Sequence, residues 1–93
     1  MDKYKVWATS PIATPEFTVN QARRQWHRLL LLKSDVKKPT YILKDQCYDG
    51  ANGEWYDSIV INRSDDISVI MGHYADKMAE WERNDWLVAS YVI

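Results

Sequence analysis

The sequence predicts one small α+β domain, with two helices packed on one face of a mostly antiparallel four-stranded sheet. The chain has 93 residues, which is enough for a single core and too few for two domains. Its hydrophobic content of 46 % and aromatic content of 13 % distinguish it from disordered chains, which are poor in both. Segments of β-type composition alternate with segments whose apolar residues recur at helical spacing. We therefore expect residues 1–93 to fold as one globular domain.

A strand and then a helix are predicted in the first third of the chain. Residues 4–8 include valine and tryptophan and predict a first strand. Thr18 and Gln21 have the spacing of a capping box, in which a hydroxyl and an amide satisfy backbone N–H groups at a helix start. A helix is therefore predicted over residues 19–33, and its apolar face carries Val19, Ala22, Trp26, Leu29 and Leu30.

A hairpin is predicted next. Residues 40–43 have the β-branched and aromatic content of a second strand. Residues 49–53 are rich in turn formers, and Asn52 followed by Gly53 is a dipeptide that tolerates positive φ. A third strand is predicted over residues 54–62. Its apolar and polar residues alternate imperfectly, so the pattern leaves the register of this strand open.

The last third is predicted to contain a second helix and a final strand. A helix is expected over residues 65–83, because two acidic residues occupy its first turn and apolar residues recur at helical spacing. An alternative makes residues 67–71 a strand that ends at Gly72. Residues 86–93 are apolar and β-rich and predict the final strand. The resulting β-α-β-β-α-β order is that of ferredoxin-like domains.

No motif in the sequence indicates catalysis or metal binding. His27 and His73 form no pattern with a neighbouring carboxylate or thiol, and zinc needs more ligands than these two and Cys47 unless acids contribute. Cys47 could act as a nucleophile only beside a histidine, and a single cysteine is more often a small buried hydrophobe. We expect no catalytic residue, no metal and no cofactor, and we interpret as solvated turn residues Asp45, Asp49, Glu54 and Asp57.

A reducing compartment is expected from the cysteine content, because one cysteine allows no disulfide within the chain. The first residues do not have the composition of a signal peptide, and the longest strongly apolar run, Leu29 to Leu32, is far shorter than a membrane span. A cytoplasmic location without membrane contact is therefore predicted.

Charge is segregated along the chain. From Thr18 to Lys44 there are seven basic residues and one acidic residue, and from Asp45 to Ile93 there are three basic and ten acidic residues. The formal net charge of −1 therefore conceals a polarised sequence. The simplest interpretation is that the two predicted helices lie near each other and neutralise one another, because exposed charges usually do little more than solvate a surface.

Three kinds of ligand are compatible with this pattern. A protein partner, or a second copy of the chain, could bind an acidic and aromatic face formed by Glu80, Trp81, Glu82, Asp85, Trp86 and Tyr91. Nucleic acid could bind a basic face formed by Arg23, Arg24, His27, Arg28, Lys37 and Lys38, although the overall pI of about 6.1 argues against it. A small molecule could occupy a pocket lined by Trp and Tyr near His27 or His73.

The function predicted from the sequence is non-enzymatic protein binding. Small Trp-rich domains without catalytic motifs resemble, in size and composition, the inhibitors and adaptors that phages and other mobile genetic elements encode. The hypothesis is that the acidic and aromatic face blocks a host enzyme or defence complex. Burial in the core is expected for three further tryptophans, Trp7, Trp26 and Trp55.

Overall fold

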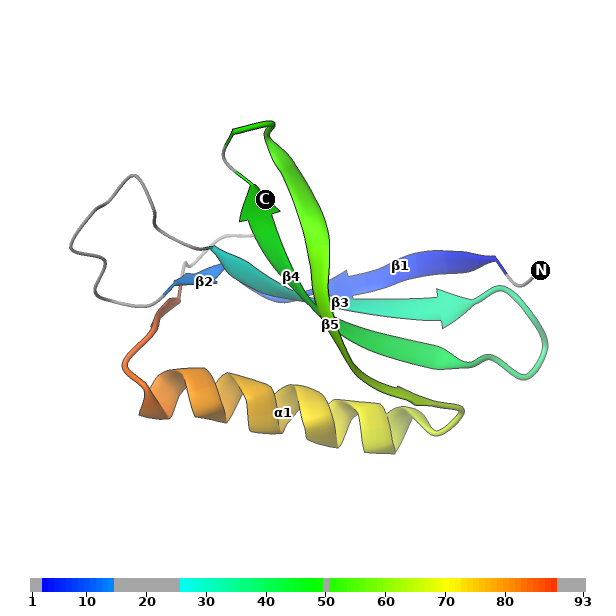
Figure 1. Cartoon of the computed structure of the whole chain (residues 1–93). Helices are drawn as coiled ribbons and strands as arrows, with labels where there is room; N and C mark the ends of the chain where they lie inside the picture. Colours follow the sequence, from blue (N-terminus) through cyan, green and yellow to red (C-terminus); the bar gives the residue numbers. More distant parts are fainter. Residues whose placement is uncertain (1–2, 15–25, 50, 89–93) are drawn as a thin grey trace.

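The computed structural model describes residues 3–14, 26–49 and 51–88 of the chain. These residues form one antiparallel sheet covered on one face by a single helix (Figure 1). The elements, in chain order, are β1 (Tyr4–Thr9), β2 (Ala13–Thr14), β3 (His27–Ser34), β4 (Tyr41–Asp49), β5 (Glu54–Ser64), α1 (Ile67–Arg83) and β6 (Leu87–Val88). The α+β class is confirmed. The predicted pair of helices on four strands is wrong for the described residues, which contain one helix and a six-stranded sheet.

The sheet has the strand order β5-β4-β3-β2-β6, and β1 also pairs with β3. Two short segments therefore share one side of β3, with β1 beside its C-terminal half and β2 beside its start. Ser10 joins these two segments, since its N–H donates to the Leu29 carbonyl at 2.9 Å and its Oγ accepts from the Leu29 N–H at 2.8 Å. The ferredoxin-like order is not formed, because the described elements run β-β-β-β-β-α-β.

The predicted helix over residues 19–33 is wrong wherever the structure describes it. Residues 19–25 lie outside the described residues, and residues 27–33 belong to the central strand β3. The leucine run explains the error. Leu29 and Leu31 point to the helix side of the sheet, whereas Leu30 points to the other side, and all three are buried. A strand buried on both faces is a continuous apolar run, which periodicity cannot distinguish from a buried helix.

The predicted hairpin is confirmed as β4 and β5. The strand predicted over residues 40–43 is the start of β4, and Gly53 at the turn has a φ of 73° that an L side chain rarely adopts. The pairing shifts twice, because Ile61 and Ser58 are extra residues in β5 that have no opposite partner in β4. These two bulges are the reason that the alternation in the sequence is imperfect.

The helix predicted over residues 65–83 is confirmed as α1, and the alternative strand over residues 67–71 is wrong. Asp66 caps the helix, since its carboxylate accepts from the Ser68 N–H at 2.9 Å. The hydrogen bond from the Ser68 hydroxyl, together with that from the N–H, lowers the pKa of Asp66. The acid thus suits the positive end of the helix dipole.

The C-terminus of α1 closes with a Schellman motif that uses aspartate in place of glycine. Asp85 has a φ of 58°, its N–H donates to the Glu82 carbonyl at 3.1 Å, and the Trp86 N–H donates to the Trp81 carbonyl at 3.0 Å. The turn carries Trp86 back over the last turns of α1. The indoles of Trp81 and Trp86 stack with their centroids 5.2 Å apart and their planes at 4°.

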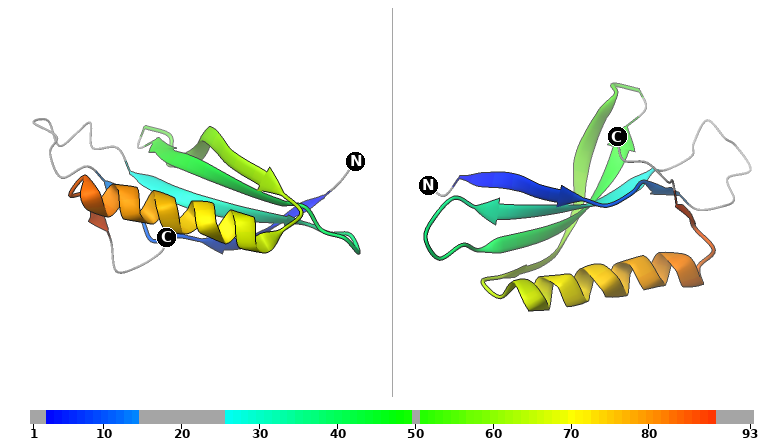
Figure 2. Two further views of the ribbon diagram at one scale, coloured as in Figure 1. Left: turned by 90° about the horizontal axis from the view of Figure 1, so that it is seen from below. Right: turned by 180° about the vertical axis from the view of Figure 1, so that it is seen from behind.

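The final strand predicted over residues 86–93 is confirmed in part. β6 pairs with β2 through Ala13 opposite Val88 and Thr14 opposite Leu87, and residues 89–93 lie outside the described part. α1 therefore runs from the end of β5, at one side of the sheet, to β6 at the other (Figure 2). No helix in the described ranges has the length and apolarity needed to cross a membrane.

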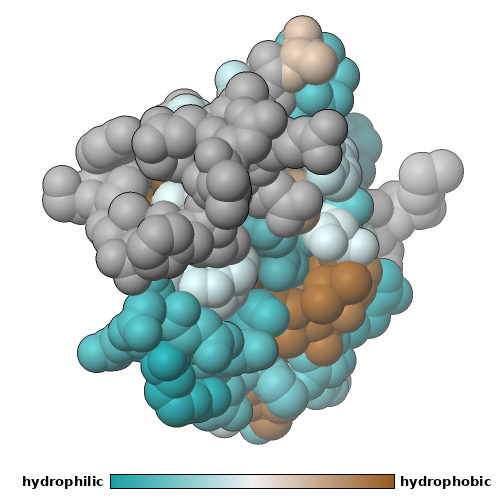
Figure 3. Space-filling view, turned by 60° about the vertical axis from the view of Figure 1, so that its left-hand side comes forward, coloured by the Kyte–Doolittle hydropathy of each residue, from teal (hydrophilic) through white to brown (hydrophobic). Residues whose placement is uncertain are grey.

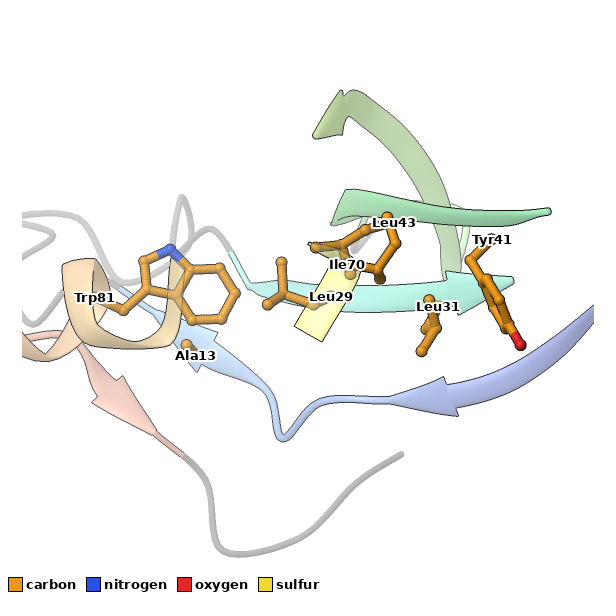
Figure 4. Close-up of a cluster of buried hydrophobic side chains, with 7 residues drawn as sticks. All are labelled: Ala13, Leu29, Leu31, Tyr41, Leu43, Ile70 and Trp81. Atoms are coloured by element: carbon orange, nitrogen blue, oxygen red, sulfur yellow. The ribbon is translucent and has the colours of Figure 1, made fainter. Parts of the chain in front are cut away.

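The hydrophobic core lies between α1 and the sheet. Leu29, Leu31 and Leu43 face the helix from β3 and β4, and Ile70 and Trp81 fill the space from α1 (Figure 4). Leu29, Leu43 and Ile70 have no exposed surface, and Trp81 is 1 % exposed. This single layer of side chains holds α1 across the sheet and fixes the position of every side chain that faces the helix.

Candidate functional site

A polar cluster is buried in the sheet next to the core. It consists of His27 at the start of β3 and of Asp45 and Cys47 on β4. His27 lies directly opposite Cys47 in the antiparallel pairing, and Asp45 is two residues before Cys47 and so shares its face. The side chains of His27 and Asp45 are 13 % and 8 % exposed, and Cys47 is 7 % exposed. Three side chains able to bind a metal or move a proton thus meet at low solvent exposure.

The three side chains meet at the His27 ring, where Sγ of Cys47 lies near both ring nitrogens, 3.8 Å from Nε2. Nδ1 of His27 lies 3.0 Å from Oδ1 of Asp45 and 3.4 Å from Sγ of Cys47. All three donor atoms lie within 4.8 Å of one another. One imidazole N–H can make a linear hydrogen bond to the carboxylate or to the sulfur, but not to both. The strand register, which sets Cys47 opposite His27, accounts for where the sulfur lies.

Tryptophan rings enclose the histidine on the helix side. The His27 ring lies with its centroid 5.0 Å from the Trp86 ring and 6.4 Å from the Trp81 ring. The indole stack at the end of α1 therefore covers the imidazole and excludes water from that side. An arrangement of this kind strengthens electrostatic interactions among the polar groups it covers.

Tyr56 borders the cluster on the solvent side. It lies opposite Cys47 in the pairing of β4 with β5 and is 52 % exposed. The pKa of Tyr56 is raised, first by the charge of Cys47 and next by a hydrogen bond to that side chain, with smaller contributions from burial and Asp49. Among the side chains around the cluster, Tyr56 is therefore one that solvent and ligands can reach.

A separate hydrogen-bond network crosses the opposite face of the sheet. Nε of Arg28 donates to Gln46 at 2.9 Å, and Gln46 donates to Asp57 at 2.9 Å. Lys44 donates to the same Asp57 carboxylate at 2.7 Å, and this bond is the main cause of the lowered pKa of Asp57. The Arg28 guanidinium lies 4.3 Å from the centroid of the Trp55 ring, and burial lowers its pKa. The network joins three strands, and it shows that Asp57 is not a simple solvated turn residue.

An open groove lies between β5 and α1. β5 ends the sheet order, and the structure shows no strand paired with its outer edge among the described residues. Ile59 and Val60 are 53 % and 55 % exposed there. Hydrophobic surface is exposed between hydrophilic regions on the face drawn in Figure 3. The groove has a volume of about 550 Å³ and is lined by Ile59, Val60, Ile61, His73, Asp76, Lys77, Glu80 and Arg83.

The acidic and aromatic face predicted from the sequence is not displayed as a unit. Trp81 is in the core and Trp86 is half-buried against it, so neither indole projects as a surface anchor. Both have this position because the apolar stripe of α1 packs on the sheet. Glu82 and Asp85 are exposed, and Glu80 lines the groove, where Lys77 pairs with it at 3.1 Å. The last predicted member of this face, Tyr91, lies outside the described residues.

The predicted basic face is also rearranged. Arg23 and Arg24 lie outside the described residues, and strand geometry sends His27 and Arg28 to opposite faces of the sheet. The exposed residues Lys37 and Lys38 lie in the loop between β3 and β4, at the end of the sheet farthest from the C-terminus of α1 (Figure 1).

Trp7 is exposed at this same end of the molecule. The prediction that it is buried is wrong, since 51 % of it is accessible, whereas Trp26 and Trp55 are half-buried. Nζ of Lys33 lies 5.4 Å from the Trp7 ring centroid, and Lys5 lies opposite Lys33 in the pairing of β1 with β3. We call the end formed by Lys5, Trp7, Lys33, Lys37 and Lys38 the basic end.

The sequence pattern did not indicate the His27, Asp45 and Cys47 cluster. The helix predicted over residues 19–33 separated His27 from the other two, and only the cross-strand register brings it opposite Cys47. A weaker signal was present, since residues 45 and 47 share a face of any strand that contains both. The groove beside His73 is lined by aliphatic and charged side chains and not by the Trp and Tyr side chains predicted there.

Comparison with known proteins finds no family model, no curated protein and no solved structure that matches this chain.

Proposed function

We propose that the chain is a non-enzymatic binding protein that takes an extended segment of a partner protein onto the outer edge of β5, in the groove beside α1. The observation that carries this proposal is the exposure of Ile59 and Val60 on a long end strand. An end strand presents a row of backbone N–H and C=O groups that another chain can pair with. Exposed charges and prolines usually protect such edges, whereas the middle of β5 is aliphatic.

The helix wall of the groove defines the chemistry of the partner segment. An extended segment sends alternate side chains to opposite faces, so every second residue would face α1. Asp76 and Glu80 line that wall beside Lys77 and Arg83, and residues 65–85 as a whole carry six acidic and two basic residues, so the helix is acidic overall. The partner segment therefore has basic side chains on the face toward α1, beside Ile59, and apolar side chains on the other face, beside Val60.

The role proposed for such binding is that of an inhibitor or adaptor. A small domain of this kind, as phages and mobile elements encode, would occupy a strand or tail of a host enzyme or defence complex. In this form the acidic character predicted from the sequence is retained through Glu80 and its neighbours. The indoles at positions 81 and 86 are replaced as contact residues by the aliphatic edge of β5.

Peptide display tests the proposal by letting the chain select its own ligands from a random library. The immobilised full chain is expected to select extended peptides in which apolar and basic residues alternate. The variant with Ile59→Lys and Val60→Lys places two charges on the edge, and we expect it to lose at least about tenfold in affinity for those peptides, or about 1.4 kcal/mol. Both positions are more than half exposed, so the variant should remain folded.

The matched control carries the same added charge on α1 and outside the groove. Val69→Lys with Met71→Lys changes two residues that are 42 % and 46 % exposed. This control is expected to bind the selected peptides as the unmodified chain does. Equal binding by the edge variant, or a concentration-dependent dimer of the chain that occupies the edge, contradicts the proposal.

A second candidate function is nucleic-acid binding at the basic end. The exposed Trp7 ring lies beside Lys33 and can stack on a base, while Lys5, Lys37 and Lys38 can contact phosphates. Because Arg28 is engaged in the sheet network, this candidate no longer depends on a basic helix.

Fluorescence anisotropy with labelled single strands at low salt tests this candidate. Trp7→Ala combined with Lys37→Ala and Lys38→Ala is expected to weaken binding, and affinity should fall as salt rises. Arg63→Ala with Arg83→Ala removes two basic residues elsewhere and should have little effect. Binding that is undetectable at low salt, or that is unaffected by the first variant, removes nucleic acid as a ligand.

A further inference from the structure

His27, Asp45 and Cys47 bring an imidazole, a carboxylate and a thiol close enough together to bind one metal ion. In tetrahedral zinc sites the metal lies about 2.0 Å from nitrogen and oxygen and about 2.3 Å from sulfur, so ligand atoms are separated by about 3.3 Å for N and O and about 3.5 Å for N and S. Nδ1 of His27 lies 3.0 Å from the Asp45 oxygen and 3.4 Å from the Cys47 sulfur. The side chains are therefore close to the spacing that one bound ion requires.

The charges of the three groups also fit a divalent cation. A carboxylate and a thiolate supply two negative charges, and a neutral imidazole supplies a lone pair. All three are at most 13 % exposed, and a carboxylate and a sulfur lie beside one imidazole at low dielectric. A dication bound between them would neutralise this charge and would use the Nδ1 lone pair. Sγ of Cys47 lies 3.4 Å from Nδ1 and 3.8 Å from Nε2, so its side chain would turn toward Nδ1 on binding.

We propose that Nδ1 of His27, the carboxylate of Asp45 and the sulfur of Cys47 bind one Zn²⁺ ion. Nitrogen, oxygen and sulfur donors together suit zinc, which is borderline in softness, better than magnesium or calcium. Three protein ligands leave one position for water or a further ligand, and the exposed Tyr56 lies opposite Cys47 on the neighbouring strand. The proposal is independent of the β5 edge, since none of the three ligands lines the groove.

The framework around the proposed site is rigid in the manner of protein metal centres. Two of the ligands lie on β4 at the centre of the sheet, and the third lies directly across from one of them on β3. Trp86 packs on the His27 ring and fixes its orientation. Binding should therefore need rotation of the ligand side chains on an unchanged backbone, and it should stabilise the folded chain because the unfolded chain does not hold the ligands together.

Zinc titration of the full chain tests the proposal. The protein is prepared without a histidine tag, stripped with a chelator and titrated with Zn²⁺ against a chromophoric competitor. We expect one ion per chain and a rise in Tm on binding. Cobalt substitution should give the visible bands of tetrahedral Co²⁺ and a near-ultraviolet band from cysteine sulfur to cobalt.

Conservative variants separate a metal role from a structural one. Cys47→Ser and Asp45→Asn nearly preserve side-chain shape. Loss of a residue that only hydrogen-bonds to a metal ligand weakens metal binding by ~10- to 100-fold. Each of these variants removes a direct ligand, so each should weaken zinc binding by more than that. Cys47→Ser should also remove the sulfur-to-cobalt band. His73→Gln alters the exposed histidine of α1 and should leave zinc binding unchanged.

Three results would overturn the zinc assignment. The first is a folded chain that does not bind Zn²⁺ at micromolar protein. The second is zinc binding that survives both cluster variants with unchanged affinity. The third is zinc binding lost in His73→Gln, which would place the ion on the surface of α1. Far-ultraviolet circular dichroism of each metal-free variant identifies any variant that fails to fold. In that case the Co²⁺ spectrum of the unmodified chain shows whether cysteine sulfur binds the metal.

Discussion

Replacing Trp81 with alanine is expected to destabilise the fold by about 3–5 kcal/mol. The indole is 1 % exposed, and it is both the largest fully buried side chain of the described residues and the stacking partner of Trp86. Its removal leaves a cavity between α1 and the sheet and releases the turn that ends the helix. Small domains are stable by only about 5–15 kcal/mol, so the variant should lose a large fraction of its stability and unfold at a markedly lower temperature.

Urea unfolding followed by circular dichroism measures the effect of Trp81→Ala. Trp7→Ala is the matched control, because it removes the same side chain from a site that is 51 % exposed. The ring of Trp7 packs on Tyr41 with centroids 5.3 Å apart, and its loss should cost about 1 kcal/mol. If the two variants lose similar amounts of stability, Trp81 does not have the core position that its burial indicates.

Leu43→Ala is expected to cost about 2–5 kcal/mol. Leu43 has no exposed surface and lies on β4 at the centre of the sheet, where it packs against Ile70 of α1 (Figure 4). Neither the sheet nor the helix can move far enough to fill the cavity, because β4 is paired along both edges. The free energy of unfolding, again from urea titration, should therefore fall steeply.

Val60→Ala provides the comparison for Leu43→Ala. Val60 is on the neighbouring strand and is 55 % exposed, so its truncation should change the stability by about 0.5 kcal/mol or less. A loss at Val60 as large as that at Leu43 would mean that β5 is covered in solution, and it would contradict the proposed open edge.

The elements that the sequence predicted correctly have strong local signals. α1 has an acid that caps its first turn and an apolar stripe at helical spacing that continues to Trp81. The β4–β5 hairpin has a dense run of turn residues that includes Gly53 with positive φ. Such signals act within a few residues along the chain, so they do not depend on how the rest of the chain folds.

The elements that were predicted wrongly depend on contacts between distant segments. Leu29 to Leu32 favours a helix or a doubly buried strand equally, and only the pairing of β3 with β1 and β4 decides between them. The same pairing brings His27 opposite Cys47, 20 positions along the chain. A helix in place of β3 conceals both the buried cluster and the open edge of β5, so neither could be recognised from the sequence.

Hydrogen exchange of the chain with and without a display-selected peptide tests the binding surface most directly. An added strand protects the outward-facing N–H groups of β5 and leaves those of the basic end unchanged. We predict that peptide slows exchange within residues 54–64 and, through side-chain contacts, in the groove-facing part of α1. Protection confined to residues 35–40 or to β1, with β5 unchanged, would show that partners bind elsewhere.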